Sequence, residues 1–274
     1  MLDRRDFLKW LAVGASGLVM PSKAAGQTVI PVPPTLMLHA RQAHLDNLDR
    51  LLDWLAERSY TPITYQTLWA RLTASQPMPA KPVILTIDDL TMVRGSSNFA
   101  FIAKMVDILI TRETPAVLGV ITQPVVVNSN NQPVQISDQD DDLWATAAGW
   151  TEHRLEFATH TESHQNLAAA GLGADDYERE IGGSAAMITE RTGQPVNTLV
   201  LPFGNGAVDA QEGTLLDPIV TACHDAGIGI VVGVAGGRKA LIPARDEEQP
   251  IYFVGRVGPQ TGAFDGIYWE IEHW

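Results

Sequence analysis

The chain has 274 residues, of which 45% are hydrophobic, and its mean hydropathy is zero, which excludes an intrinsically disordered protein and suits one large domain or two small ones. Its formal net charge of −13 disfavours nucleic acid and anionic lipid as partners, because phosphate groups select basic surfaces. Cys223 is the only cysteine, which excludes an internal disulfide and a zinc–thiolate cluster.

The first 25 residues have the pattern of an export signal. Arg4 and Arg5 precede an apolar run over residues 10–20 that is too short for a comfortable membrane span, and the paired arginines resemble a twin-arginine signal. We therefore expect residues 1–25 to be a signal peptide and residues 26–274 to be the exported domain, in the periplasm or outside the cell. The export signal would be the only membrane association; an uncleaved N-terminal anchor is the alternative.

The rest of the chain alternates short apolar runs with helical patterns. In chain order, these patterns predict a strand at 34–40, a helix at 45–59, a strand at 82–89, a helix at 98–113, strands at 115–121 and 155–160, a helix at 175–193, and strands at 197–204, 227–234 and 251–257. The polar and acidic segment 128–150 is expected to be a solvated loop rather than a binding element. Such alternation argues for a parallel sheet, and the strand number and chain length suit a closed barrel better than an open sheet.

Candidate reactive residues fall where predicted strands end. His39 ends the first strand, Asp88 and Asp89 end the strand at 82–89, and His160 ends another, while the Pro202–Gly204 stretch follows a fourth. Parallel α/β barrels keep their chemistry at this C-terminal edge of the strands. The sequence therefore predicts that these residues lie around one site.

Two of these stretches have the residue types of a metal site. Adjacent carboxylates at the end of an apolar strand are costly to bury, and a divalent cation would relieve that cost, with one aspartate as ligand and the other as general base. His160 and His164, four residues apart, would share one face of a helical turn and bind the same ion. Taken singly, each pair also fits an ordinary polar loop or helix face. Two imidazoles and one carboxylate leave positions for water and substrate.

Three stretches resemble the motifs of one family. "LTIDDL", "HTESHQNL" and "LPFG" are similar, in order and spacing, to motifs of the NodB-type polysaccharide deacetylases, carbohydrate esterase family 4. The stretches "TLMLHA" and "KPVILTIDDL" resemble the subgroup that acts on poly-N-acetylglucosamine. The resemblance covers residues 34–205. It implies a single-domain, distorted (β/α) barrel that binds one divalent ion, with zinc expected and cobalt or nickel as alternatives.

The resemblance assigns a role to each candidate residue. Asp89, His160 and His164 match the metal ligands, and Asp88 matches the catalytic base. His39 occupies the place from which the poly-N-acetylglucosamine subgroup takes its general acid.

Other positions follow from the same comparison of motifs. Pro202, Phe203 and Gly204 match the third motif, and a backbone N–H near Phe203 is expected to hold the oxyanion. His44 and His153 have no counterpart in the motifs, and we expect both at the surface.

The implied reaction is hydrolysis of a carbon–nitrogen bond other than a peptide bond. A metal-bound water would attack the acetyl carbonyl of an acetylated, extracytoplasmic glycan and remove an N-acetyl or O-acetyl group. Two alternatives stay open. The first alternative is a non-catalytic glycan-binding relative. The second is a metal-dependent hydrolase of a small amide or ester, which a closed and narrow pocket would favour.

Two departures from the family pattern bear on activity. Leu90 stands where the first motif has glycine, and Val200 stands where the third motif has an arginine that pairs with the base. Arg94 and Arg256 are candidates to replace that arginine, but we expect no replacement. Without a cation beside it, Asp88 would lack an influence that lowers its pKa.

Overall fold

The computed structural model describes residues 32–74, 76–127, 132–136, 140–209, 213–234, 242–243, 250–258 and 264–274. All of them belong to one unit, Pro31–Trp274. The predicted signal peptide, residues 1–25, lies outside the described residues.

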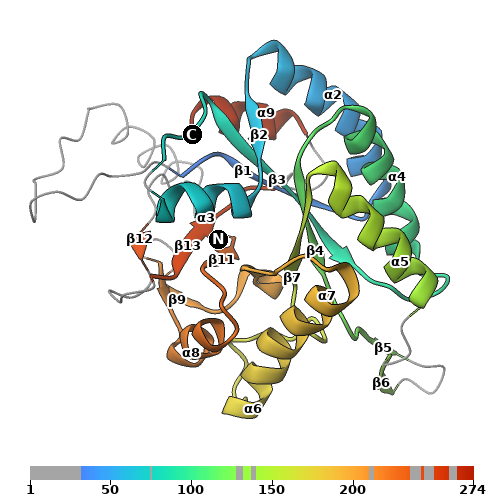
Figure 1. Cartoon of the computed structure of the whole chain (residues 1–274), viewed down its shortest axis with the longest axis vertical. Helices are drawn as coiled ribbons and strands as arrows, with labels where there is room; N and C mark the ends of the chain where they lie inside the picture. Colours follow the sequence, from blue (N-terminus) through green and yellow to red (C-terminus); the bar gives the residue numbers. More distant parts are fainter. Residues whose placement is uncertain are drawn as a thin grey trace, which may run out of the picture. The chain divides into compact units, whose positions relative to one another are not determined.

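A curled, mostly parallel sheet forms the centre of this unit (Figure 1). Its strands lie in the order β1 (Thr35–His39), β3 (Pro82–Leu90), β4 (Ala116–Val120), β7 (Leu155–Thr159), β8 (Thr198–Val200), β11 (Ile230–Gly233) and β13 (Tyr252–Gly255), with β2 (Thr61–Ile63) beside β3 and the antiparallel β12 (Ile242–Pro243) beside β13. Leu36 forms a parallel bridge with Val257, and the Met37 N–H donates to the Val257 carbonyl at 2.7 Å. This bridge joins the two ends of the sheet, so the predicted distorted (β/α) barrel is confirmed.

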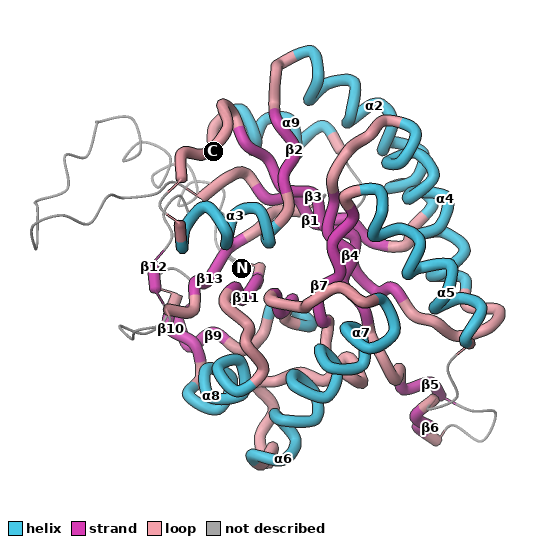
Figure 2. The backbone as a smooth tube through the Cα atoms, in the orientation of Figure 1, coloured by secondary structure: helices cyan, strands magenta, loops and turns pink. Residues whose placement is uncertain are grey.

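Helices surround the strands (Figure 2). They are α2 (Gln42–Glu57), α3 (Tyr65–Thr73), α4 (Ser97–Thr111), α5 (Asp141–Trp150), α6 (Ala174–Tyr177), α7 (Ser184–Thr192), α8 (Asp217–Asp225) and α9 (Asp265–Glu272). Leu48, Leu51, Leu52 and Leu55 form the buried face of α2, as their spacing predicts. Among the described residues, no helix has the length and apolar character that crossing a membrane requires.

Strand β3 shows how the sequence sorts residues between the two sides of the sheet. Successive strand side chains point to opposite faces. Leu85 and Ile87 belong to the apolar core that the helices cover. Thr86 and Asp88 lie on the other face, where the side chain of Arg256 reaches both of them inside the barrel. The interior is therefore partly polar.

The segment 128–150 differs from the loop predicted for it. Residues 128–131 and 137–139 lie outside the described residues, β5 (Val125–Val127) pairs with β6 (Pro133–Gln135), and Asp141–Trp150 form α5. The Asp140 carboxylate accepts from the N–H groups of Asp142 and Leu143, at 3.0 and 3.2 Å. The acidic run is a helix start, where carboxylates cap free N–H groups, and Trp144 and Trp150 are buried.

The helix predicted at 175–193 is present but interrupted. Between α6 and α7 the chain makes a π-helical turn, η2 (Glu178–Gly183), and the helix ends at Gly193 with a φ of 73°, as expected for a glycine C-cap. A short antiparallel pair, β9 (Ala207–Asp209) and β10 (Thr214–Leu215), follows β8.

Candidate metal centre and active site

The end of β3 places its two aspartates in different surroundings. The register between β3 and β4 shifts between Ile87 and Leu90, and Asp89 has a φ of 69° in the left-handed region, which aspartate tolerates better than most residues. Asp88 is buried inside the barrel, whereas Asp89 is partly exposed. Leu90, where the family motif has glycine, is fully buried and is paired with Val120. Leu90 is therefore compatible with the turn, because the positive φ falls on Asp89.

Asp89 meets both histidines of the second motif. Its Oδ1 lies 3.5 Å from His160 Nε2 and 3.7 Å from His164 Nε2, and one ligand atom from each of the three residues lies within 4.8 Å of the others. His160 Nδ1 is 2.8 Å from the Val200 carbonyl, which only accepts hydrogen bonds, so Nδ1 carries the proton. In the neutral ring, Nε2 then presents a lone pair toward a carboxylate.

Two acceptors facing each other need a cation or a proton between them. A set of two imidazoles and one carboxylate is a common zinc donor set. Burial and the neighbouring His160 lower the pKa of His164, which favours the neutral imidazole that binds metals. The residues present therefore fit a divalent metal ion.

The sequence predicted that the two histidines share one face of a helical turn, and this prediction is wrong. Residues 160–164 form a loop after β7, in which Thr161 and His164 have positive φ values of 67° and 63°. The loop folds back so that the two rings still meet, with 4.8 Å between their centroids. Spacing alone did not distinguish this loop from a helix, because both bring residues i and i+4 together.

Asp88 has a cationic partner, contrary to our expectation from Val200. Arg256, just after β13, contacts Asp88 with both Nη atoms, at 2.6 and 2.7 Å, and both side chains are 1% exposed. Burial opposes the ionisation of Asp88, but Arg256 and His160 outweigh it and hold the pKa of Asp88 below its usual range. Arg94 instead pairs with Asp140 at 2.7 Å and is 79% exposed.

His39 lies on β1 directly opposite Asp88 in the parallel register. Partners in such a register point to the same face of the sheet, so His39 points into the barrel as Asp88 does, and both residues lie at the C-terminal ends of their strands. Burial lowers the pKa of His39, and the nearby carboxylates of Asp88 and Asp89 oppose that effect.

The surface position predicted for His44 is wrong, whereas His153 is exposed as predicted. His44 is buried in the first turn of α2, and its Nδ1 accepts a hydrogen bond from the His39 N–H at 2.8 Å. Burial and the neighbouring His39 lower the pKa of His44 to about 4, so that His44 is a neutral acceptor at physiological pH. His44 lies four residues before Leu48 on the buried face of α2, so the helical spacing of the apolar residues was the signal that could have located it.

The third motif forms a tight turn after β8, with Pro202 buried. Phe203 has a φ of 58°, its side chain is 64% exposed, and its ring centroid lies 4.6 Å from that of His164. Gly204 has a φ of 69°, and a Cβ there would lie 2.8 Å from the Val234 Cβ, so only glycine fits. Pro202 has no N–H and Gly204 donates to Leu201, which leaves Phe203 as the candidate oxyanion donor in this turn.

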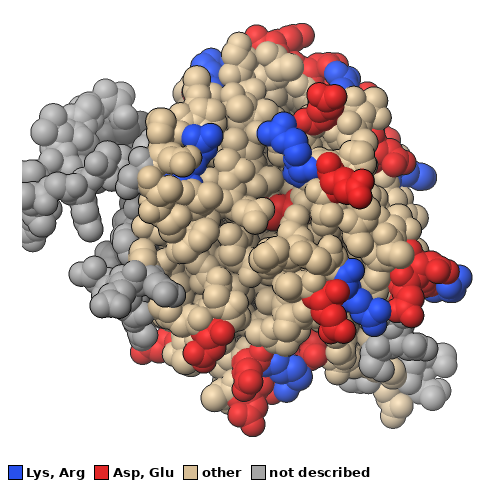
Figure 3. Space-filling model, viewed as in Figure 1, with Lys and Arg blue, Asp and Glu red and all other residues tan. Residues whose placement is uncertain are grey.

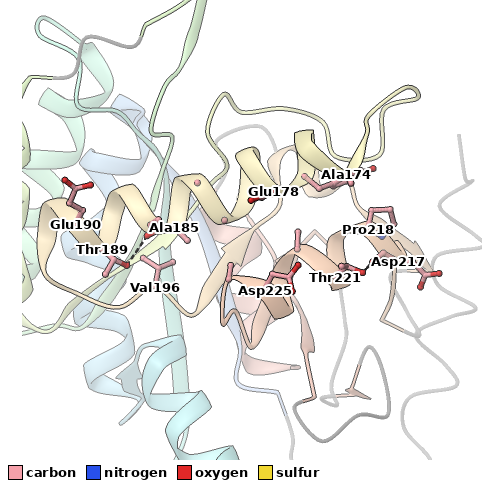
Figure 4. A pocket seen from close by; sticks show the side chains of 16 residues that line it. Ala174, Glu178, Ala185, Thr189, Glu190, Val196, Asp217, Pro218, Thr221 and Asp225 are labelled. Carbon is pink, nitrogen blue, oxygen red and sulfur yellow. Dashed lines mark hydrogen bonds between the residues drawn. The ribbon is translucent and has the colours of Figure 1, made fainter.

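A cavity lies away from these residues. It has a volume of about 1230 Å³ and runs between α6, η2 and α7 on one side and α8 on the other (Figure 4). Its lining includes Glu178, Glu190 and Asp225 and none of the predicted site residues. On the face in Figure 3, acidic and basic side chains are interspersed, and neither sign covers the whole face.

Arg256 is a site residue that the family motifs did not locate. The sequence does contain a pattern that indicates Arg256, because "IYFVGRV" places an arginine at the end of an apolar strand. This is the same pattern that marked Asp88. A buried charge at a strand end requires a partner, and the two opposite charges supply one to each other.

Comparison with known proteins agrees with this geometry. A family model described as "Polysaccharide deacetylase" matches residues 75–215, just over half of the chain. No curated protein gives a significant match. Among solved structures, the chain is similar to the Streptococcus pyogenes deacetylase PplD in complex with acetate, with 16% identity, a TM-score of 0.62, and coverage of 89% of this chain and 99% of that one.

Two further structures have the same fold. A de-N-acetylase from Aggregatibacter actinomycetemcomitans has 17% identity and a TM-score of 0.59, over 86% of this chain and 98% of that one. IcaB from Ammonifex degensii also has 17% identity and a TM-score of 0.59, over 88% of this chain and 98% of that one. By its match to the family model, supported by this shared fold, the chain belongs to the polysaccharide deacetylase family.

Proposed function

We propose that the protein is a metal-dependent deacetylase that removes N-acetyl or O-acetyl groups from an acetylated, extracytoplasmic glycan. The observation that carries this proposal is the convergence of Asp89, His160 and His164 next to a buried Asp88 that pairs with Arg256. Export rests on the sequence of residues 1–25 alone. Two of the similar structures, a deacetylase and a de-N-acetylase, support the same class of reaction.

Asp89, His160 and His164 would hold the metal, with zinc as the first candidate and cobalt or nickel as alternatives. When bound, a divalent ion in such a site polarises the acetyl carbonyl and lowers the pKa of a water molecule. The hydrogen bond from His160 Nδ1 to the Val200 carbonyl fixes the ring so that Nε2 faces the other ligands.

Asp88 is the proposed general base. Arg256 keeps its carboxylate ionised at neutral pH, so that it can accept a proton from the attacking water. The bidentate contact also fixes the orientation of the carboxylate. The two aspartates would thus have different roles. Asp89, which contacts the histidines, would bind the metal, and Asp88 would act as the base.

His39 is the proposed general acid. It lies across the β1–β3 register from Asp88, and the two carboxylates nearby favour its protonated form against the effect of burial. A protonated His39 would give its proton to the leaving sugar amine or hydroxyl. His44 accepts from the His39 N–H and thereby fixes the backbone at this position.

The Phe203 N–H is the proposed donor to the oxyanion. The Phe203 ring, which is exposed and next to His164, offers an apolar surface beside the reacting group. The partial exposure of Asp89, His164 and Phe203 supports a polymeric substrate over a small amide or ester. The intact Asp88–Arg256 pair supports turnover over a purely glycan-binding role.

The test is acetate release from a panel of acetylated glycans by the metal-reconstituted protein. We expect release from at least one N-acetylated glycan, and loss of release in Asp88→Asn with zinc content unchanged. Glycan binding without acetate release would instead favour the non-catalytic alternative. Acetate release only from small amides or esters would favour the alternative of a metal-dependent small-molecule hydrolase.

A further inference from the structure

The π-helical turn η2 contacts the loop that carries the two histidines. Glu180, in the middle of this turn, is buried although it is charged. Its carboxylate accepts from the Ser163 N–H at 2.9 Å and from the Ser163 hydroxyl at 2.7 Å. Its backbone carbonyl accepts from the Glu162 N–H at 3.0 Å. One residue therefore holds two consecutive residues that lie between His160 and His164.

The geometry of the turn makes these contacts possible. A π-helical turn is wider than an α-helical one and disturbs the regular hydrogen-bond ladder of the helix. The Glu180 carbonyl is consequently able to accept from another segment. Such turns are rare and are often found at functional sites. The interruption of the helix predicted at 175–193 thus coincides with the residue that contacts the loop.

The loop needs support because its backbone is strained. Thr161 and His164 both have positive φ values, which cost free energy for residues other than glycine. Strained backbone persists only where surrounding contacts fix it. The Thr161 carbonyl accepts from Thr122 and the Glu162 carbonyl accepts from Gln123, so the β4 side holds the loop through its backbone. Glu180 adds side-chain contacts to Ser163.

One arginine lies among three carboxylates in this region. Arg179 pairs with Glu162 at 3.0 Å and with Asp176 at 2.9 Å, and it lies 3.8 Å from the Glu180 carboxylate. Burying a carboxylate is costly unless hydrogen bonds and a nearby opposite charge compensate it, and Ser163 and Arg179 supply both to Glu180.

We propose that Glu180 is a positioning residue that holds the 160–164 loop in the conformation in which His160 and His164 converge on Asp89. This inference rests on the proposed metal site and deepens it. Glu180 does not touch the metal or the substrate. It acts through Ser163, by keeping the two imidazoles in place before the ion binds. Residues that orient metal ligands typically contribute about 10- to 100-fold to metal affinity.

The test measures Zn²⁺ binding to the full-length, metal-free protein by competition with a chromophoric chelator. Glu180→Ala removes both side-chain contacts to Ser163, and we expect about 10- to 100-fold weaker Zn²⁺ binding. Glu180→Gln retains an acceptor oxygen without the charge, and Ser163→Ala removes the hydroxyl contact alone; both should lie between Glu180→Ala and wild type. Glu178→Ala and Glu178→Gln are matched controls, because Glu178 is exposed in the same turn.

The absorption spectrum of the Co²⁺-loaded protein separates positioning from mere stability. A purely structural role would lower the melting temperature of metal-free Glu180→Ala without changing the Co²⁺ spectrum at saturation. We expect the spectrum to change, because its bands report ligand geometry. If Glu180→Ala does not fold, Glu180→Gln and Ser163→Ala carry the test.

Folded Glu180 variants with unchanged Zn²⁺ affinity and an unchanged Co²⁺ spectrum would overturn the proposal. Wild-type protein that binds no Zn²⁺ would overturn the metal site and the proposal together. Weaker Zn²⁺ binding in the Glu180 variants, alongside wild-type protein that binds Zn²⁺ but releases no acetate, would support the positioning role and contradict the proposed function.

Discussion

The pairing of Asp88 with Arg256 sets the charge at the centre of the candidate site. Both side chains are buried, and each is the other's closest opposite charge, at 2.6 Å. Because the folded-state pKa of Asp88 is depressed, the pair contributes stability above the unfolded-state pKa, and that contribution is lost as pH falls through the folded-state pKa. We therefore expect the pair to affect both stability and the acidic limb of the proposed activity.

Replacing Arg256 should expose both effects. In Arg256→Leu, Asp88 would be left buried and unpaired, which typically costs about 3–5 kcal/mol of stability. The pKa of Asp88 should rise, so the acidic limb of kcat/KM should move to higher pH. Arg256→Lys should show a smaller shift, because it retains the charge but not the bidentate contact.

Arg94→Leu is the control, since Arg94 is exposed and does not contact Asp88. Urea unfolding and pH–rate profiles of the metal-loaded proteins would provide the measurements. A folded Arg256→Leu protein whose acidic limb coincides with that of wild type would show that Asp88 is not the base.

His39 is the residue whose predicted role is most open to direct test. His39→Ala should retain zinc content and lower turnover by about 10²- to 10⁴-fold, the usual contribution of a general acid. His153→Ala is a matched control, because His153 is an exposed histidine. Metal analysis and acetate release would decide the matter. Turnover within twofold of wild type in His39→Ala would remove the assignment.

The candidate base and metal ligands that sequence reasoning located occur as pairs that are close in the chain. Asp88 and Asp89 are adjacent, and His160 and His164 are four apart, so each pair leaves a local pattern. The contact between Arg256 and Asp88 spans 168 residues, so the sequence offered Arg256 only as one of two candidate partners, and we expected neither to replace the missing arginine. Glu180 and Ser163 are 17 residues apart on different elements, and no local pattern pairs them.

At the scale of elements, the strands and long helices could be predicted because their apolar spacing is periodic. Helix α5 could not, since its acidic start looks like a solvated loop until Asp140 is seen to cap it. The π-helical turn η2 leaves no trace in the spacing of apolar residues. Its presence depends on tertiary contacts, among them the hydrogen bond from Glu162 to the Glu180 carbonyl.

Helix α3 is attached to the N-terminal end of β7 by a buried carboxylate. Glu156 Oε2 accepts from the Gln66 N–H at 2.7 Å, in the first turn of α3, and the Thr198 hydroxyl donates to Oε1 at 3.1 Å. Burial raises the pKa of Glu156 to about 7, although these hydrogen bonds oppose the shift. This end of the barrel is opposite to the one that carries the candidate site.

Glu156 should make the protein less stable as pH rises from about 4.5 to about 7, since its folded-state pKa lies above the ordinary value of 4.5. In that window the folded state binds more protons than the unfolded state. Glu156→Gln should flatten this part of the stability profile, because glutamine keeps an acceptor and does not titrate. The midpoints of urea unfolding between pH 4.5 and 8, for wild type and Glu156→Gln, would measure this pH dependence of stability. An equal slope in the variant would contradict the raised pKa.

At the scale of the whole unit, the barrel brings segments from distant parts of the sequence to one end. Alternation of strands and helices predicted the barrel, and chemistry at strand ends predicted which end would carry the site. The sequence did not show which residues close the barrel. The bridge between β1 and Val257 brings the end of β13, and with it Arg256, back beside β1 and β3. The candidate metal ligands then connect the end of β3 with the loop after β7.

Metal binding should therefore stabilise the entire unit. A ligand that binds only the folded state adds RT ln(1 + [L]/Kd), or about 4.1 kcal/mol when its concentration is 1,000 times Kd. Zn²⁺ should raise the melting temperature of wild-type protein, and a chelator should reverse the increase. His164→Ala should show no such difference, because His164 is a candidate ligand that is partly exposed, so its loss leaves the core intact. His153→Ala should respond as wild type does. Equal melting temperatures of wild-type protein with and without Zn²⁺ would mean that Asp89, His160 and His164 do not form a metal site.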